Sequence, residues 1–295
     1  MSYFTDKKEF FVGIDSDGCA FDTMELKHRK VFIPQAIASL GFQSISESYR
    51  KTAETVNLYS RSRGLGRFEA LAICLDRMRS IDALAPFVPS PEPLLAFVNS
   101  GTPLSNDALA EYIGEDGPEI LQKALHWSRE SDRKIAKVVV NNPPFSGVQT
   151  TLSFAHTFAN TMIVSVSPAA ALQQEWGAAG FLDDIDLVAG QEFGPKKAQL
   201  AAALSEGFEP TKALMVGDAP GDHAAAKSHG ILFFPIVPGR EEESWQNLER
   251  DGLTRFRQGR FSGRYQEEIL DEYYAALDSH SPGLESSQEL TPPAG

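Results

Sequence analysis

Two aspartates separated by one residue end the first apolar run of the chain. Residues Phe10 to Ile14 are followed by Asp15, Asp17 and Gly18. The apolar run is typical of a strand buried on both faces of a parallel sheet. In an extended chain, residues two apart point the same way, so both acids can face one spot at the carboxyl end of the strand. Two carboxylates this close repel unless a cation lies between them or one is protonated. The pair therefore indicates a hard cation, most simply Mg²⁺, and the alternative is an acidic turn that caps the next helix.

The same pattern occurs again late in the chain. An apolar run at 213–217 is followed by Asp218, and Asp222 lies four residues further on. If Asp222 opens a helix, both carboxylates can lie near the end of one strand. The intervening Ala-Pro-Gly is also compatible with an ordinary loop. Two acidic strand ends in one parallel sheet are harder to explain by chance than one.

A hydroxyl and two lysines complete the residues that could do chemistry. A third apolar run, from Thr161, reaches Ser165, and Ser167 is close enough to take the same place. Lys196 and Lys197 lie in the first turn of a predicted helix, where the helix dipole disfavours a cation. A lysine there usually has another reason, such as a carboxylate or phosphate partner. A plain surface lysine is the alternative, above all for Lys197.

The second half of the chain alternates helical patterns with short apolar strands, which implies a doubly wound parallel sheet. The predicted strands are 10–14, 161–166, 186–189, 213–217 and 231–236. The predicted helices are 146–159, 169–178, 196–205, 223–228 and 265–277. The first strand would join this sheet, so the acids and Lys196 would meet at one edge of it.

Residues between the first strand and this region predict a mostly helical inserted lobe. Helices are expected from Thr23 to Gly41 with an interruption at Pro34, over 68–79, up to Tyr112 and over 118–137. Residues 44–59 are mixed and polar, and the proline-rich segment 81–106 is expected to be irregular. The prediction is an α/β core from residues 1–22 and 143–278, a helical cap at 23–142 and a disordered tail at 279–295.

Composition limits the class of protein. The N-terminus lacks the zones of a secretory signal, no apolar run approaches the roughly 20 residues that span a bilayer, and only two cysteines occur. These features predict a cytoplasmic protein without a membrane partner. The net charge of −13 argues against nucleic acid as a partner. Residues 50–79 nevertheless hold seven basic residues against three acids, which suits a small anionic ligand.

Taken together, the four motifs resemble the haloacid dehalogenase-like hydrolase superfamily. That family has Asp-x-Asp after its first strand, Ser or Thr after the second, a Lys at a helix start and a late Gly-Asp-x-x-x-Asp. All occur here in order, as Asp15 and Asp17, Ser165, Lys196, and Asp218 with Asp222. The resemblance covers residues 9–22 and roughly 143–236. It implies a Rossmann-like core, and the inserted lobe matches the position of the family's helical cap.

The resemblance also implies a chemistry for each residue. Asp15 would be the nucleophile that forms an aspartyl-phosphate, and Asp17 would protonate the leaving oxygen and then activate water. Mg²⁺ would be held by Asp15, the Asp17 backbone carbonyl and Asp218. Asp222 would support Lys196 or a metal-bound water. Ser165 would donate to the phosphoryl oxygens, and Lys196 would balance the charge on Asp15 and the phosphate.

These residues predict a Mg²⁺-dependent phosphatase that acts on a small phosphorylated metabolite. Asp17 argues against the dehalogenase and phosphonatase branches of the family, which lack that acid. A phosphomutase of the β-phosphoglucomutase type shares the whole core and is the first alternative. A binding protein without turnover is the second, although a binder has no need of Asp17. Gly18, and the cap residues Arg63 and Arg67 on a glycine-flanked loop, are the predicted substrate contacts.

Overall fold

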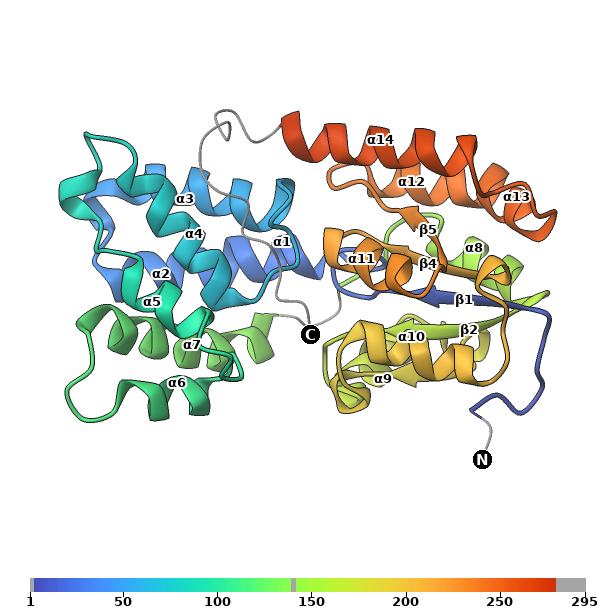
Figure 1. The fold of residues 1–295 in the computed structure, drawn as a ribbon, viewed down its shortest axis with the longest axis horizontal. Coiled ribbons are helices and arrows are strands. Elements are labelled where there is room, and N and C mark those ends of the chain that lie inside the picture. The colour runs from blue at the N-terminus through green and yellow to red at the C-terminus, as the bar shows by residue number, and fades with distance from the viewer. Residues whose placement is uncertain (1–2, 139–141, 280–295) are drawn as a thin grey trace.

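The computed structural model describes residues 3–138 and 142–279. One lobe contains a five-stranded parallel sheet, and a helical lobe lies beside it (Figure 1). The strand order is β3-β2-β1-β4-β5, with β1 in the centre. The strands are β1 (Phe10–Ile14), β2 (Ala159–Val164), β3 (Leu187–Ala189), β4 (Ala213–Gly217) and β5 (Leu232–Pro235). The doubly wound α/β core and the inserted helical cap predicted from the sequence are confirmed.

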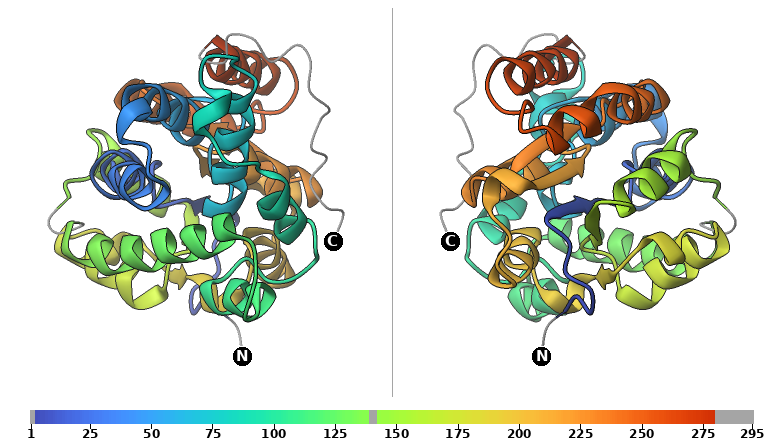
Figure 2. Two further views of the ribbon diagram at one scale, coloured as in Figure 1. Left: turned by 90° about the vertical axis from the view of Figure 1, so that its left-hand side faces the viewer. Right: turned by 90° about the vertical axis from the view of Figure 1, so that its right-hand side faces the viewer.

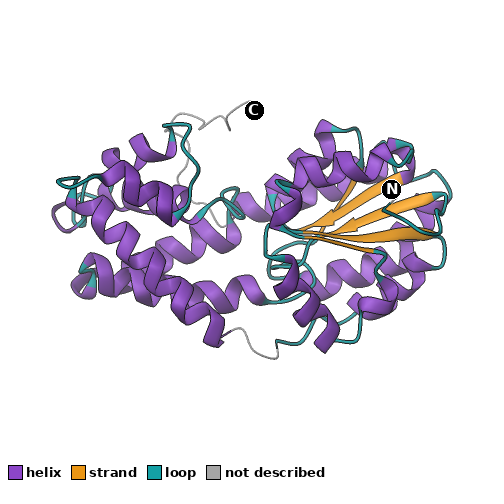
Figure 3. Cartoon of the chain, turned by 90° about the horizontal axis from the view of Figure 1, so that it is seen from below, coloured by secondary structure: helices purple, strands orange, loops and turns teal. Residues whose placement is uncertain are grey.

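Apolar side chains alternate between the two faces of the sheet because successive strand residues point to opposite sides. On β1, Val12 and Ile14 enter one hydrophobic cluster, and Phe11 enters another on the opposite face. Helices cover both faces (Figure 3). The first cluster is closed by α8 (Val148–His156), α9 (Ala169–Ala178), α12 (Glu241–Asn247) and α13 (Leu253–Arg257). The second is closed by α10 (Lys196–Ser205), α11 (Pro220–Ser228) and α14 (Arg264–Ser279).

Strand β1 lies between partners from distant parts of the chain. Phe10 pairs with Ala159 of β2, and Phe11 pairs with Ala213 of β4. The chain runs outward from β1 through β2 to β3 and then crosses back to place β4 on the other side of β1. This reversal lies between β1 and β4, and in open α/β sheets ligands bind in the crevice at the carboxyl ends of such strands. Viewed from the core side, the strands lie between flanking helices (Figure 2).

The cap has a hydrophobic cluster of its own, formed by residues between Ile33 and Trp127. Its helices are α1 (Thr23–Lys27), α2 (Ile33–Leu40), α3 (Ser46–Glu54), α4 (Arg67–Arg79), α5 (Glu92–Val98), α6 (Asn106–Ile113) and α7 (Glu119–Val138). The Trp127 indole donates to the Phe32 carbonyl at 2.9 Å. This bond joins α7 to the π-helical turn His28–Phe32, which connects α1 to α2.

Several predicted element boundaries were wrong. Pro34 does not interrupt the helix, since the helical backbone continues from the π-helical turn His28–Phe32 into α2, with Pro34 near the start of α2. The mixed segment 44–59 contains α3, and the proline-rich segment 81–106 contains α5, with Pro93 again near the helix start. Pro93 thus lies in the first turn of a helix, within a segment that was predicted to be irregular.

The C-terminal helix α14 runs along the core, and its last turn lies toward the cap (Figure 1). It is longer by three residues than the predicted helix at 265–277. The predicted disordered tail at 279–295 lies outside the described residues except for Ser279, which ends α14.

Candidate active site

Asp15 lies at the carboxyl end of the central strand. Its backbone N–H donates to the Val216 carbonyl at 3.0 Å, so the pairing of β1 with β4 continues to this residue. The side chain is buried, and its Oδ1 accepts from the Ser16 N–H at 2.8 Å. Burial raises the pKa of Asp15 well above its ordinary value, although the charge of Lys196 opposes this effect. Burial thus outweighs the neighbouring cation in setting the pKa of Asp15.

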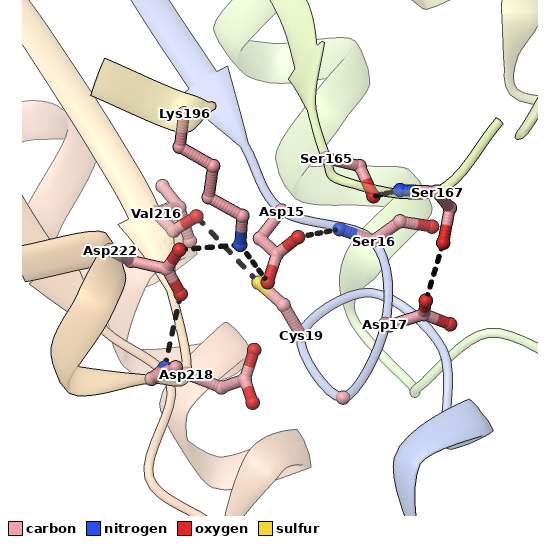
Figure 4. Close-up of polar contacts among 12 residues, drawn as sticks. Asp15, Ser16, Asp17, Cys19, Ser165, Ser167, Lys196, Val216, Asp218 and Asp222 are labelled. Carbon is pink, nitrogen blue, oxygen red and sulfur yellow. Dashed lines mark hydrogen bonds and ion pairs between the residues drawn. The ribbon is translucent and has the colours of Figure 1, made fainter. Parts of the chain in front are cut away.

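Lys196 begins α10 and reaches into the site (Figure 4). Its Nζ lies 2.8 Å from Asp15 Oδ2 and 2.5 Å from Asp222 Oδ1. Burial alone would lower the pKa of Lys196, but the two carboxylates outweigh it and raise the pKa above its ordinary value. Lys197 is exposed. Of the two adjacent lysines, Lys196 is thus the one in contact with the predicted nucleophile.

Asp218 and Asp222 complete an acidic trio with Asp15. One carboxylate oxygen from each lies within 4.8 Å of those of the other two. Asp222 Oδ2 accepts from the Ala219 N–H at 3.0 Å, which caps α11 and fixes the carboxylate beside the end of β4. A Cβ at Gly217 would come within 2.5 Å of the Asp222 carboxylate, so only glycine leaves room for it there.

The acidic trio fits a hard divalent cation. Asp218 is 1% exposed, and its Oδ1 has no hydrogen-bond partner in the described part of the chain. A buried carboxylate oxygen without a partner is costly, and a cation would satisfy it. All three donors are oxygens, which favours a hard divalent cation over softer metals. Burial, opposed by Arg63, raises the pKa of Asp218.

Asp17 lies apart from this trio, contrary to the expectation that both acids face one spot. The chain turns after Asp15, since the N–H groups of Cys19, Ala20 and Phe21 all donate to the Ser16 carbonyl. A turn removes the two-residue alternation of an extended strand. The Asp17 carboxylate consequently points away from the other acids toward Ser167 (Figure 4). Asp17 was predicted as a metal ligand, but its side chain lies outside the acidic cluster of Asp15, Asp218 and Asp222.

Three side chains hold the Asp17 carboxylate. Lys27 Nζ lies 2.6 Å from Oδ1, Thr23 also donates to Oδ1, and Ser167 Oγ donates to Oδ2 at 2.8 Å. Burial raises the pKa of Asp17, but the charge of Lys27 and these hydrogen bonds outweigh it and leave the pKa below its ordinary value. Asp17 is therefore an ionised carboxylate in this arrangement.

Ser165 and Ser167 have different positions. Ser165 follows β2 directly, is buried, and accepts from the Ser167 N–H at 3.2 Å through its Oγ. Gln199 donates to the Ser165 carbonyl at 2.8 Å and fixes the strand end. Ser165 thus has the place after the strand that the sequence motif predicts, whereas Ser167 is the hydroxyl that contacts Asp17.

The two predicted cap arginines also differ. Arg63 reaches across to the core, where its Nε lies 2.6 Å from Asp218 Oδ2. Arg67 stays inside the cap, where its Nη1 lies 2.9 Å from Ser128 Oγ and 2.6 Å from Asp132 Oδ1. The structure therefore brings Arg63, but not Arg67, to the acidic trio.

Lys27, Glu175 and Tyr273 were missed by sequence reasoning. Ser16 Oγ donates to Glu175 Oε2 at 3.3 Å, and the Tyr273 hydroxyl donates to the Asp218 carbonyl at 2.9 Å. Burial and the charge of Asp17 raise the pKa of Glu175 to about 7. A single Lys, Glu or Tyr in an amphipathic helix carries no spacing signal. The one available hint was that α14, which supplies Tyr273, follows the last strand as a long amphipathic helix.

No family model matches the chain, and no curated protein matches it. Among the described residues, no helix combines the length and apolar character needed to cross a membrane.

Several solved structures are similar to this chain. A haloacid dehalogenase-like family hydrolase from Streptococcus pneumoniae is 17% identical over 82% of this chain and 91% of that one, with a TM-score of 0.45. A HAD-superfamily hydrolase of subfamily IA from Geobacter sulfurreducens is 15% identical over 80% and 90%, with a TM-score of 0.41. A β-phosphoglucomutase from Clostridium difficile is 14% identical over 88% and 98%, with a TM-score of 0.47.

These names agree with the resemblance found in the sequence motifs. At such identities and TM-scores the likeness says nothing about the activity of this chain. The activity has to be inferred from the residues of the site itself.

Proposed function

We propose that the protein is a Mg²⁺-dependent phosphohydrolase that acts on a small phosphate ester through an aspartyl-phosphate on Asp15. The observation that carries this proposal is the contact of Lys196 with Asp15 and Asp222 in a trio of buried carboxylates, Asp15, Asp218 and Asp222, at the carboxyl ends of β1 and β4. A site that serves only to bind phosphate would be built from cations and N–H groups rather than three buried carboxylates. Carboxylates in these numbers suit a nucleophile together with metal ligands.

In the first step, an Asp15 carboxylate oxygen would attack phosphorus while the bond between phosphorus and the leaving oxygen breaks. Lys196, 2.8 Å from Asp15 Oδ2, favours the ionised and therefore nucleophilic form of Asp15. A metal ion held by Asp15, Asp218 and the Asp17 carbonyl, with Asp222 close to it, would offset the repulsion between carboxylate and phosphate. Ser165 is the proposed donor to the phosphoryl oxygens.

Asp17 would act in both halves of the reaction. In the first, it would protonate the leaving oxygen, and in the second it would accept a proton from the water that attacks the aspartyl-phosphate. Its ionised form beside Lys27 suits the second half. The first half requires a protonated Asp17, so the contact with Lys27 has to loosen when substrate binds.

The proposed substrate is a small phosphorylated metabolite, contacted by Gly18, Arg63 and Arg67. In the described geometry, Arg63 Nη2 donates to the Gly18 carbonyl at 3.3 Å, and Arg67 is engaged inside the cap. Substrate contact by these residues therefore requires the cap loop that carries Arg63 to move, as lids do in many enzymes.

Phosphate release from a panel of small phosphate monoesters tests the proposal. The variant Asp15→Asn should lose at least about a thousandfold in rate, equivalent to about 4 kcal/mol in the barrier. Asp82→Asn, a change of an exposed cap residue, is the matched control and should keep the wild-type rate. Chelation should stop phosphate release, and added Mg²⁺ should restore it.

Retention of more than about a tenth of the rate by Asp15→Asn would exclude covalent catalysis by this residue. Full activity in excess chelator would exclude the metal. Transfer of the phosphoryl group to a second hydroxyl of a sugar phosphate, without release to water, would instead indicate the phosphomutase that shares this core.

A further inference from the structure

One charged side chain of the cap is buried in the core. Arg63 and Asp218 form an ion pair at 2.6 Å in which each side chain is only 2% exposed. Arg63 Nη1 also donates to the Leu58 carbonyl at 2.7 Å, and Nη2 donates to the Gly18 carbonyl at 3.3 Å. The guanidinium therefore links the cap to the loop after β1 and to the loop after β4.

Two glycines shape the slot that holds this guanidinium. A Cβ at Gly18 would come within 2.5 Å of Arg63 Nη2 and 2.8 Å of Asp218 Oδ2. A Cβ at Gly64 would come within 2.6 Å of the Ala219 Cβ. Both glycines have a positive φ, at +81° and +83°, which other residues rarely adopt. The close approach of the cap loop to the core is thus built into the backbone.

Charge explains why Asp218 needs a partner. Asp15, Asp218 and Asp222 lie together, and Lys196 contacts only the first and the last of them. Without Arg63, Asp218 would be a buried carboxylate beside two others and with no cation in contact, an arrangement of high energy. Arg63 removes that cost, but it also covers Oδ2, one of the two oxygens that Asp218 offers to a metal.

We infer that Arg63 is the resident cation of the acidic trio and that a divalent metal ion binds Asp218 in competition with it. The inference rests on the proposed metal site. Three carboxylates with Lys196 and a divalent ion are neutral as a group, whereas retention of Arg63 would add a buried positive charge. A guanidinium and a divalent ion on the same carboxylate repel each other, and the burial of Arg63 and Asp218 weakens the screening of this repulsion by solvent.

Metal binding then has a structural consequence for the cap. Displacement of Arg63 breaks its contacts with Asp218 and Gly18, which are part of what holds the loop 60–66 on the core. The released guanidinium becomes available at the crevice for an anionic group of the substrate. The substrate contact predicted for Arg63 would follow metal binding and would not coincide with the ion pair described above.

Binding of Mn²⁺ to the protein without substrate tests the competition, with free Mn²⁺ measured by electron paramagnetic resonance. Arg63→Gln should bind Mn²⁺ at least about tenfold more tightly than wild type, because no internal cation has to leave. Arg63→Lys keeps a cation and should fall between the two. Asp218→Asn should lose most Mn²⁺ binding.

Arg61→Gln is the matched control. Arg61 lies on the same loop and pairs with Asp278 of α14 at 2.6 Å, but it does not contact the acidic trio. Its loss loosens the cap without removing the competing charge, so Mn²⁺ affinity should change less than about twofold. An equal gain in Arg61→Gln and Arg63→Gln would overturn the competition.

A second readout follows the loop itself. In wild type, Mn²⁺ should speed tryptic cleavage after Arg63, whose side chain is buried in the ion pair, and it should leave cleavage after Arg61 less affected. Unchanged cleavage together with unchanged affinity in both Arg63 variants would overturn the inference. The Arg63→Lys variant retains a buried cation and keeps the test usable if Arg63→Gln folds poorly.

The proposed function can fail independently of this inference. If wild type and Arg63→Gln both fail to bind Mn²⁺, the competition is overturned, and phosphate release with and without chelator still decides the enzyme activity. If Mn²⁺ binding follows the expected order but no ester is hydrolysed, the competition holds and the proposed reaction does not.

Discussion

Charged side chains in the core and in the cap are arranged differently. In the core, Asp15 and Asp222 are buried and share contacts with Lys196, because each lies at a strand end or helix start of the same sheet edge. In the cap, Arg67 pairs with Asp132 where their side chains are 31% and 45% exposed. Removal of one member of a buried group of charges strongly destabilises the fold, whereas exposed ion pairs contribute little to stability. Charged residues therefore contribute differently to the free energy of unfolding in the two lobes.

Arg63 is an exception to this difference between the lobes. It belongs to the cap by sequence, yet its ion pair with Asp218 is as buried as any in the core. Four residues further on, Arg67 stacks on the Phe32 ring at 5.0 Å and remains within the cap. The local sequence does not distinguish the two arginines. They differ because the loop between them directs Arg63 toward the core and leaves Arg67 within the cap.

Removal of the central cation of the core should give the largest effect on stability. Lys196→Met leaves Asp15 and Asp222 buried beside each other without their shared partner. We expect a loss of about 3–5 kcal/mol in the free energy of unfolding at neutral pH, measured by urea denaturation. Lys197→Met, a change at the exposed neighbour, should cost less than about 0.5 kcal/mol. Similar losses for the two variants would break the distinction between buried and exposed charge.

A pH-dependent effect of intermediate size is expected at Glu175. Its pKa is raised to about 7 in the folded protein, whereas a glutamate in an unfolded chain titrates near 4.3. Between these values the unfolded chain releases a proton that the folded protein keeps, so wild-type stability falls as pH rises from about 4.5 to 7.

Glu175→Gln cannot titrate and should escape this loss. The difference in urea midpoint between the variant and wild type should increase in favour of the variant from pH 5 to pH 8. A constant difference, or one that changes in the opposite direction, would contradict the raised pKa of Glu175.

The smallest effect is expected in the cap. Arg67→Ala removes a partly exposed ion pair and the hydrogen bond to Ser128, and it should lower the free energy of unfolding by about 1 kcal/mol or less. Mn²⁺ affinity should stay at the wild-type value. A decrease in the free energy of unfolding as large as that of Lys196→Met would show that the stability of the cap also depends on a group of charges in mutual contact.

The sequence predicted the sheet and the carboxylates of the site well because both depend on local patterns. Short apolar runs that end in an acid mark β1 and β4, and parallel strands bring such ends together. The helices α3 and α5 were not predicted, since polar composition and prolines masked short helices whose stability comes from packing.

Contacts between elements distant in the sequence could not be predicted in the same way. Lys27 contacts Asp17, and Tyr273 contacts the Asp218 carbonyl, from helices whose positions follow from tertiary packing. The separation of Asp17 from the other acids depends on the turn after Ser16. A two-residue alternation describes an extended chain and fails once the backbone turns.

The central position of β1 also has a consequence for the order of folding during synthesis. Its neighbours begin at Ala159 and Ala213, so the strand emerges from the ribosome long before either partner exists. At about 5–20 residues per second, the roughly 150 residues that separate β1 from its first partner correspond to about 7–30 seconds. During that interval the cap, a continuous segment with its own hydrophobic cluster, can fold while Phe10–Ile14 remains an unpaired apolar strand. We expect this short segment to be the part of the nascent chain most exposed to aggregation and most dependent on chaperones.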